Sequence, residues 1–390
     1  MSERSGLLLL DGELVPGSLW FEAGRITRIT RGAALSPGAG KDLLIIAPGL
    51  VDLHVHGYAG SEPITDLAGM GSALARVGTT SYLPTLFPEQ PAALGATCSK
   101  IWSRAQGLAL SQGARVLGLH LEGPFVNPLS AGALPIDCLA EPSPAALAAI
   151  LGSSSGDAHG IRTMTLAAEL PGSADLVQEL TRAGVRVSLG HSLATSAEAR
   201  SAAKAGALGV THLFNAMSKL HHREVGLLGF ALSSDALCAE IIGDLVHVGR
   251  DAVELSLRAR GVQGLALVSD ALPGAGTGCD VFECHGATHR IRDGAIWIDD
   301  RNAPDGSRLG GAATPQLGAL RRLVRAGVVS LPEALRMAAE TPARSLGLGD
   351  ELGCLRVGAR ADLILLDSAL ELREVLLGGK IFELGHPGNS

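Results

Sequence analysis

Six polar residues stand out in this chain because each lies at or just beyond the end of a short apolar run. They are four histidines and two acids: His54, His56, Glu122, His191, His212 and Asp270. Imidazole and carboxylate groups are the ligands that divalent transition metals take in hydrolytic sites. One such residue would be an ordinary polar position at a strand end. Six of them favour a single shared metal site.

The positions of these residues call for elements that bring strand ends together. Within a strand, residues i and i+2 point to the same side, so His54 and His56 aim two imidazoles at one place. From residue 44 onward, continuous apolar runs alternate with helical segments, as buried parallel strands do. We count eight such strands, which predicts a (β/α)8 TIM barrel of the α/β class, with its site at the carboxyl ends of the strands.

The two ends of the chain follow a different pattern from the barrel. The first residues alternate apolar runs with turns at Asp11-Gly12 and Ala23-Gly24, which predicts a small β-meander. The C-terminal segment returns to a β pattern. We therefore expect a small β-sandwich domain from residues 1–46 and 350–390, and a catalytic barrel from residues 47–349. Two longer excursions, at 218–235 and as a hairpin between 270 and 314, are expected to shape a pocket.

Composition excludes several classes of function. The chain has 390 residues, 46% of them hydrophobic, and a net charge of −7, so it lacks the basic surface that nucleic acid requires. No apolar stretch is long enough for a signal peptide or a membrane span. The six cysteines are scattered and form no CxxC pair. We expect free thiols and a cytoplasmic protein that binds neither nucleic acid nor membrane.

Several longer motifs resemble one family. The chain resembles the amidohydrolase superfamily and, within it, the N-acetylglucosamine-6-phosphate deacetylases. The matching segments, in order, are PGLVDLHVHG, GTTSYLPTL, LEGPF, GHS, THLFNAM followed by HHRE, DLVHV, SDA and ADLILLD. The resemblance implies metal-dependent hydrolysis of the N-acetyl group of N-acetylglucosamine 6-phosphate, giving glucosamine 6-phosphate and acetate. It also implies a homodimer.

The resemblance also implies a ligand set for one or two divalent ions per chain. His191, His212 and Glu122 would hold one ion, and His54 with His56 would hold a second ion that shares Glu122. The alternative is one ion, with His54 and His56 as polar neighbours. Zinc is the first choice of metal; iron, manganese and cobalt are alternatives. No lysine lies in a predicted barrel strand, so a bridging role falls to Glu122 rather than to a carbamylated lysine.

The remaining site residues are carried over from the same resemblance. Asp270 would act as general base and then as general acid. The other positions, expected to bind substrate, are Ala133, Leu134, Asn215, Ala216, Arg223, His247, Leu309, Gly310 and Gly311. Among them, Asn215 and Ala216 resemble phosphate-contacting backbone. Arg223 resembles a phosphate-binding arginine that in relatives can reach across a dimer interface.

One position departs from the family pattern. Relatives carry a substrate-binding histidine where this chain has Leu134, in Gly132-Ala133-Leu134-Pro135, and a leucine cannot donate a hydrogen bond. Leu309–Ala312 also replaces a loop that usually ends in serine. Either another donor polarises the acyl carbonyl, or the substrate is a different N-acyl amino sugar or amine. A third reading is a barrel that has lost turnover, against which the full ligand set with Asp270 argues.

Overall fold

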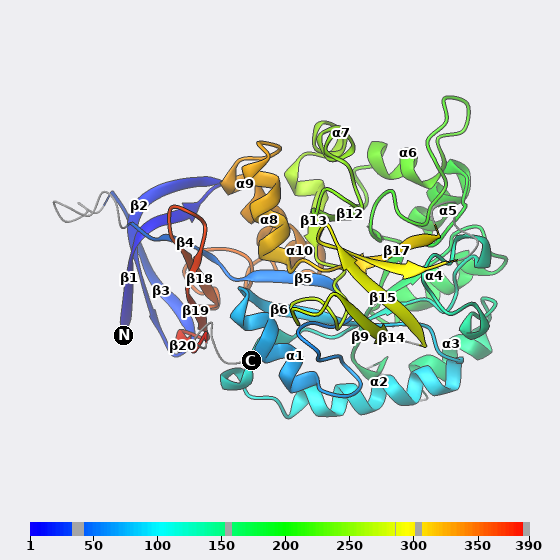
Figure 1. Cartoon of the computed structure of the whole chain (residues 1–390), viewed down its shortest axis with the longest axis horizontal. Coiled ribbons are helices and arrows are strands. Elements are labelled where there is room, and N and C mark those ends of the chain that lie inside the picture. Colours follow the sequence, from blue (N-terminus) through cyan, green and yellow to red (C-terminus); the bar gives the residue numbers. More distant parts are fainter. Residues whose placement is uncertain (33–42, 153–157, 285, 301–305, 385–390) are drawn as a thin grey trace.

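The computed structural model describes residues 1–32, 43–152, 158–284, 286–300 and 306–384, and its larger part is a barrel of eight parallel strands (Figure 1). Neighbouring strands of the barrel follow one another in sequence order. Nearly all of their residues are buried, which explains why they read as continuous apolar runs. The predicted barrel is confirmed. Its strands are β5 (Leu50–Val55), β6 (Thr79–Leu86), β8 (Leu119–Glu122), β9 (Ile161–Leu166), β10 (Arg186–Leu189), β11 (Gly209–Val210), β12 (Cys238–Ile242) and β13 (Leu265–Val268), with the short β7 (Arg115–Val116) beside β6.

A helix follows each barrel strand, and the buried faces of the helices share one hydrophobic core with the strands. Among the described residues, no helix has the length and apolar character that a membrane crossing requires. The helices are α1 (Leu67–Arg76), α2 (Pro91–Gln106), α3 (Pro144–Leu151), α4 (Ser173–Arg182), α5 (Ser196–Ala205), α6 (Gly226–Ser233), α7 (Arg250–Arg260) and α8 (Gln316–Arg325), followed by α9 (Leu331–Leu335), a π-helical turn (Arg336–Glu340) and α10 (Thr341–Ser345).

The helix after the sixth strand corrects the expectation of a long excursion at 218–235. Residues 226–233 form α6, of which Leu227 and Phe230 are buried. The segment reads GLLGFALS and is apolar all round, so it shows no periodic stripe by which a helix is identified. Only the stretch before α6 is a true loop.

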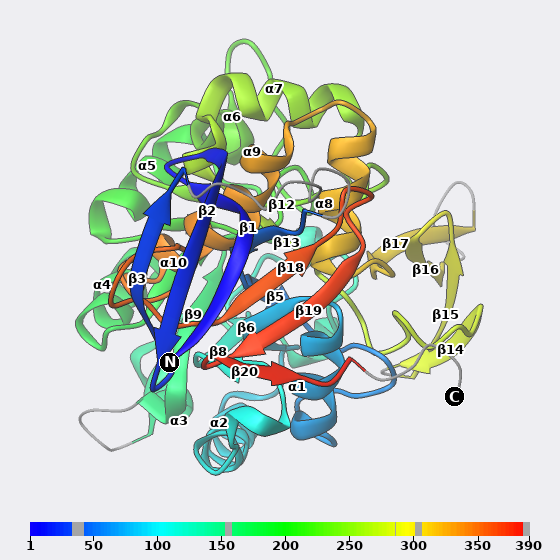
Figure 2. The same cartoon turned by 90° about the vertical axis from the view of Figure 1, so that its left-hand side faces the viewer.

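A seven-stranded sheet beside the barrel is built from both ends of the chain, as predicted. In Figures 1 and 2, the blue N-terminal strands and the red C-terminal strands lie side by side in this sheet. It closes over its own apolar cluster, which includes Leu8, Leu19 and Leu363. Its strands are β1 (Ser2–Leu10), β2 (Glu13–Glu22), β3 (Arg25–Arg31), β4 (Ile45–Pro48), β18 (Leu363–Leu366), β19 (Leu372–Leu377) and β20 (Lys380–Phe382).

The chain passes from the small sheet to the barrel at Gly49. Sequence reading treats residues 44–56 as one strand, but the structure divides them into β4, which pairs with β1 and β18, and β5, which begins the barrel. A Cβ atom on Gly49 would lie 2.1 Å from Oγ1 of Thr80. Glycine therefore permits the close crossing at which one apolar run serves two sheets.

The excursion between residues 270 and 314 is larger than the expected hairpin. It forms a four-stranded antiparallel sheet of β14 (Val281–Cys284), β15 (Ala287–Arg292), β16 (Ala295–Asp299) and β17 (Ser307–Ala312), drawn in yellow in Figure 1. The last strand reads SRLGGA, and its two glycines hide the β pattern in the sequence.

The barrel closes between its first and last strands, next to the predicted metal ligands. The backbone N–H of Asp270 donates to the carbonyl oxygen of His54 over 2.8 Å, and that of His56 donates to Ala271 over 2.9 Å. The buried carboxylate of Asp52 accepts from the backbone N–H groups of Ser269 and His54. Closure thus fixes His54, His56 and Asp270 side by side.

Candidate metal centre

Five barrel strands deliver the six residues that the sequence singles out. His54 lies in β5, His56 comes just after that strand, and Glu122 ends β8. The other three residues each lie two positions beyond the end of a strand: His191 after β10, His212 after β11 and Asp270 after β13. The last three adopt left-handed backbone conformations, with φ of 47°, 30° and 51° respectively. Such conformations are disfavoured for residues other than glycine and gather at functional sites.

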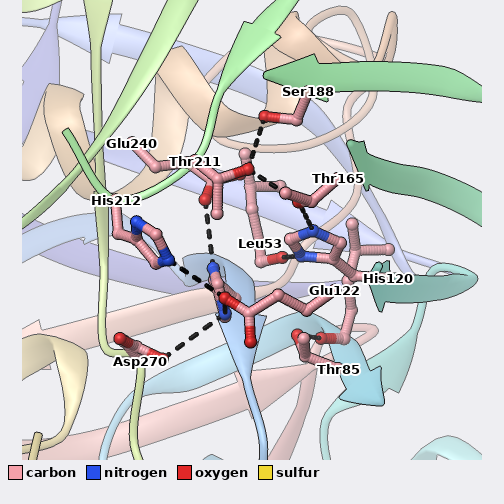
Figure 3. A network of polar contacts seen from close by, with 12 residues as sticks. Leu53, Thr85, His120, Glu122, Thr165, Ser188, Thr211, His212, Glu240 and Asp270 are labelled. Carbon is pink, nitrogen blue, oxygen red and sulfur yellow. Dashed lines mark hydrogen bonds and ion pairs between the residues drawn. The ribbon is translucent and has the colours of Figure 1, made fainter. Parts of the chain in front are cut away.

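The carboxylate of Glu122 lies at the centre of the cluster. Its Oε1 atom is 3.0 Å from Nε2 of His191 and 3.0 Å from Nε2 of His212, while its Oε2 atom is 3.2 Å from Nε2 of His56. Nε2 of His54 is 3.5 Å from Oε1. Figure 3 shows the contact of Glu122 with His212, and Asp270 beside them. One carboxylate thus faces four imidazoles at once.

The donor set fits a divalent metal ion. Two groups of three donors, His54–His56–Glu122 and Glu122–His191–His212, place one ligand atom per residue within 4.8 Å of one another. Metal–ligand bonds of about 2.0–2.2 Å in a tetrahedral site separate the ligand atoms by about 3.3–3.6 Å. Nε2 of His191 and Nε2 of His212 lie 3.0 Å apart, and a cation bound to both atoms would stabilise this close approach.

Two of the histidines have a fixed proton arrangement that suits a metal ligand. Nδ1 of His191 donates to the carbonyl oxygen of Ser130 over 2.9 Å, which leaves the lone pair on Nε2. Nδ1 of His54 lies 3.1 Å from the carboxylate of Glu240. Nδ1 of His56 and of His212 is buried without a hydrogen-bond partner in the described part of the chain.

Burial and nearby charges shift the pKa values of the acidic residues in the cluster in opposite directions. Burial alone would raise the pKa of Glu122, but the surrounding histidines, His54 and His191 foremost, hold that pKa well below its usual range. Burial, with the nearby charge of Glu122, raises the pKa of Asp270 well above its usual range. Burial also raises the pKa of Asp52 to about 7. Opposite shifts in neighbouring carboxyl groups are typical of sites that perform acid–base chemistry.

A cavity of about 140 Å³ opens onto the cluster and contains most of the predicted site. His54 lies beneath its floor with no exposed surface. The lining consists of His56, Phe87, Glu122, Gly132, Ala133, Leu134, His191, His212, Asn215, Ala216, His247, Asp270, Leu309, Gly310 and Gly311. The structure therefore brings eight of the nine expected substrate-binding residues together around the metal cluster.

The ninth, Arg223, lies elsewhere. It is exposed on the loop between β11 and α6, is not part of the cavity lining, and its Nη1 atom is 3.2 Å from Nε2 of His222. Within one chain, the cavity therefore lacks this guanidinium.

One wall of the cavity is apolar. The ring of Phe87 stacks on His56 with 4.0 Å between ring centroids and 15° between planes. Leu134, only 4% exposed, packs with Val126 and Ala131.

A larger cleft, of about 550 Å³, lies between the small sheet and the barrel, but its arginines are paired with carboxylates, as Arg336 is with Glu340. The smaller cavity is therefore the one that carries chemistry.

Two acids near the cluster were missed in the sequence. Asp244 follows β12 by two residues, as three other site residues follow their strands, and it accepts from Nδ1 of His247 over 2.6 Å. Glu240 is a buried carboxylate within β12. The sequence did contain a signal for each: Asp244 is an acidic residue just beyond an apolar run, and Glu240 is a single charged residue inside that run.

Comparison with known proteins places these features in context. The model of the amidohydrolase family matches residues 45–389. An N-acetylgalactosamine-6-phosphate deacetylase of Escherichia coli O157:H7 is 33% identical, covering 87% of this chain and 88% of that protein. An N-acetylglucosamine-6-phosphate deacetylase of Bacillus subtilis (strain 168) is also 33% identical, covering 86% and 84%.

The chain is also similar in three-dimensional structure to a solved relative. It is a mutant N-acetyl-D-glucosamine-6-phosphate deacetylase from Mycobacterium smegmatis in complex with N-acetyl-D-glucosamine 6-phosphate. The two chains share 28% identity and a TM-score of 0.85, over 97% of this chain and 98% of that one.

Proposed function

The chain belongs to the amidohydrolase family, and from that premise we propose that it hydrolyses the N-acetyl group of N-acetylglucosamine 6-phosphate to glucosamine 6-phosphate and acetate, in amino-sugar catabolism. The observation that carries the proposal is that one cavity is lined by three clustered histidines, Glu122 and Asp270, with His54 buried beside them. A barrel that had lost turnover would have no reason to keep this set complete.

The cluster is proposed to hold one or two divalent ions, zinc first, with iron, manganese or cobalt as alternatives. His191, His212 and Glu122 form one group of donors, and His54, His56 and Glu122 form the other. A bound divalent ion supplies Lewis-acid chemistry, which polarises a carbonyl oxygen and makes water more acidic.

Asp270 is proposed as the proton carrier. Its carboxylate lines the cavity, and Oδ1 lies 3.4 Å from Nε2 of His54. As general base it takes a proton from the attacking water while the C–O bond forms at the acetyl carbon. As general acid it then gives that proton to the amide nitrogen as the C–N bond breaks, so that a neutral amine and acetic acid are formed, and the acid passes its remaining proton to the amine or to solvent to become acetate.

The lining residues outside the metal cluster are proposed to bind the sugar and its phosphate. Nδ1 of His247 is held by Asp244, which leaves Nε2 available to the ligand. Asn215 and Ala216 line the same cavity. Arg223 is proposed to reach the phosphate from the partner subunit of a homodimer, because it is exposed and lies outside its own cavity. The free cysteines suit a cytoplasmic protein.

A second substrate has specific support. A relative as similar as any named above deacetylates N-acetylgalactosamine 6-phosphate, and Leu134 gives this chain an apolar cavity wall. The two sugars differ in the configuration of one ring hydroxyl, so a change in the lining can choose between them.

Steady-state release of free amine from a panel of sugars tests the proposal. The panel contains N-acetylglucosamine 6-phosphate, N-acetylgalactosamine 6-phosphate and unphosphorylated N-acetylglucosamine. We expect the highest kcat/KM on the first. A higher value on the second would transfer the assignment to the galacto sugar, and no turnover of any of them by metal-loaded protein would contradict the proposed activity.

A further inference from the structure

Glu240 is a buried carboxylate whose presence inside the barrel needs a reason. It lies in β12, is 1% exposed, and its Oε1 atom has no hydrogen-bond partner among the residues that the structure describes. A buried carboxylate is costly unless it is paired, and an apolar residue would fill the same space without that cost. Its Oε2 atom has one hydrogen-bonding contact, Nδ1 of His54 at 3.1 Å.

This contact determines which nitrogen of His54 carries the proton. A carboxylate can only accept, so Nδ1 of His54 is the donor, and the lone pair of the neutral ring lies on Nε2. Nε2 is the atom that faces the cluster, 3.2 Å from Nε2 of His56 and 3.5 Å from Oε1 of Glu122. The bond therefore presents His54 to the cluster in the form that ligates a metal.

The other imidazoles of the cluster lack this device. Nδ1 of His191 meets a neutral carbonyl oxygen, and Nδ1 of His56 and of His212 meets no partner in the described structure. A carboxylate behind an imidazole both orients the ring and makes it a stronger ligand. Glu240 thus acts on one half of the cluster, the half formed by His54 and His56.

A neighbouring histidine holds the ring of His54 in place but does not compete for its role. The ring of His120 meets that of His54 edge-on, with 4.7 Å between centroids. Both nitrogens of His120 are already engaged, Nδ1 with the carbonyl oxygen of Leu53 and Nε2 with Oγ1 of Thr165. Figure 3 shows this chain of contacts continuing through Thr165 on the far side of His120.

We propose that Glu240 is the positioning residue that makes His54 and His56 a second metal position, next to the one formed by His191 and His212. The inference rests on the proposed metal-dependent function, and it adds that Glu240 determines whether the site binds one metal ion or two. Without Glu240, the proton of His54 is free to move to Nε2, and the second position loses a ligand. Loss of such an orienting partner lowers metal affinity by about 10- to 100-fold.

The test compares metal binding by full-length wild type, Glu240→Gln and Glu240→Leu. Each protein is stripped with a chelator and titrated with Zn²⁺, and its metal content is then measured by elemental analysis. Glutamine keeps an acceptor for Nδ1, whereas leucine removes both acceptor and charge. Ser188→Ala is the matched control, because Ser188 is buried in the same barrel interior and bonds to Thr211 rather than to a histidine.

We expect two ions per chain in wild type and in Ser188→Ala. In Glu240→Gln the second ion should bind more weakly, by about 10-fold or more, and in Glu240→Leu it should be lost while the first is kept. A carboxylate with only a structural role would lower thermal stability in all Glu240 variants and leave the ion count unchanged.

Retention of a second ion at wild-type affinity by Glu240→Leu would overturn the inference. If that variant does not fold, unchanged affinity in Glu240→Gln overturns it equally. Wild type that hydrolyses the sugar with a single ion also overturns it, while the proposed function stands. Wild type that binds no ion and hydrolyses nothing contradicts the proposed function itself.

Discussion

At the level of single residues, Asp270 is proposed to carry the proton. The carboxylate faces the cavity, and its pKa is raised first by burial and then by the charge of Glu122. Asp270→Asn keeps the shape of the side chain and removes its basicity. We expect kcat to fall by about 10²- to 10⁴-fold, with metal content unchanged.

Asp175→Asn is the matched control for this variant, because Asp175 is exposed on α4, away from the cavity lining. Steady-state kinetics gives kcat for both variants, and elemental analysis gives their metal content. If Asp270→Asn retains near-normal kcat with its full metal content, the proton carrier is another group.

Leu134 tests how far the cavity departs from that of the family. Its side chain lines the cavity beside Phe87 and donates no hydrogen bond. Leu134→His adds a donor that can polarise the acetyl carbonyl. Loss of such a donor can cost about 10²- to 10³-fold, but a bound metal shares the task. We therefore expect kcat/KM on N-acetylglucosamine 6-phosphate to rise by about 10-fold.

Leu134→Met, which conserves volume, should leave that value nearly unchanged. A folded, metal-loaded Leu134→His enzyme that gains nothing would show that the apolar wall suits the native substrate. The galacto sugar would then be the leading candidate.

Sequence alone revealed the residues that carry chemistry but not those that hold them. His54 and Glu122 stand out because imidazoles and carboxylates at strand ends are rare. Glu240 bonds to His54 from another part of the chain, and only the closed barrel brings that pair together, so the pairing depends on strand order and stagger, which no local pattern contains. Asp244 bonds to His247 three residues further on, and that contact depends on the conformation of the loop after β12.

At the scale of elements, local periodicity predicted the barrel strands and failed where one run serves two purposes. Residues 44–56 read as one strand, but β4 belongs to the small sheet and β5 to the barrel. The division depends on how closely Gly49 can approach Thr80, which is a tertiary contact. Helix α6 was missed for the opposite reason, because an element buried on every side shows no periodicity.

The crossing at Gly49 gives a stability prediction. A Cβ atom there meets the side chain of Thr80 at 2.1 Å, so Gly49→Ala must shift one of the two sheets. We expect the free energy of unfolding to fall by about 1–3 kcal/mol, as in other overpacked sites. Denaturant unfolding followed by circular dichroism measures it.

Gly249→Ala is the control, since a Cβ at Gly249 meets nothing within 4 Å and its φ is −62°. Equal stability of the two variants would mean that the crossing tolerates a side chain. The division between the sheets would then need another explanation.

At the scale of the whole molecule, barrel closure and assembly complete the site. Closure places Asp270 against His54 through a backbone bond of 2.8 Å. Assembly is proposed to supply Arg223, which is exposed and absent from its own cavity lining. If Arg223 acts across a homodimer, each active site combines residues of two chains.

Mixed dimers test this arrangement. Asp270→Asn and Arg223→Ala are each impaired, but a dimer containing one of each has one site with both native residues. Co-expression should restore about a quarter of wild-type activity at low substrate concentration. Co-expression of two copies of Asp270→Asn is the control. Activity no higher than the average of the separate variants would place Arg223 outside the partner's site.

The proposed reaction is metal-dependent deacetylation of a phosphorylated amino sugar. Its most direct test is the initial rate of amine release from N-acetylglucosamine 6-phosphate by wild type, measured after chelation and again after Zn²⁺ is restored. We expect the rate to be lost on chelation and to recover with one or two bound ions per chain, since the cluster offers ligands for that number from His54, His56, Glu122, His191 and His212. A rate that is unaffected by removal of the metal, or absent from fully loaded protein, would contradict it.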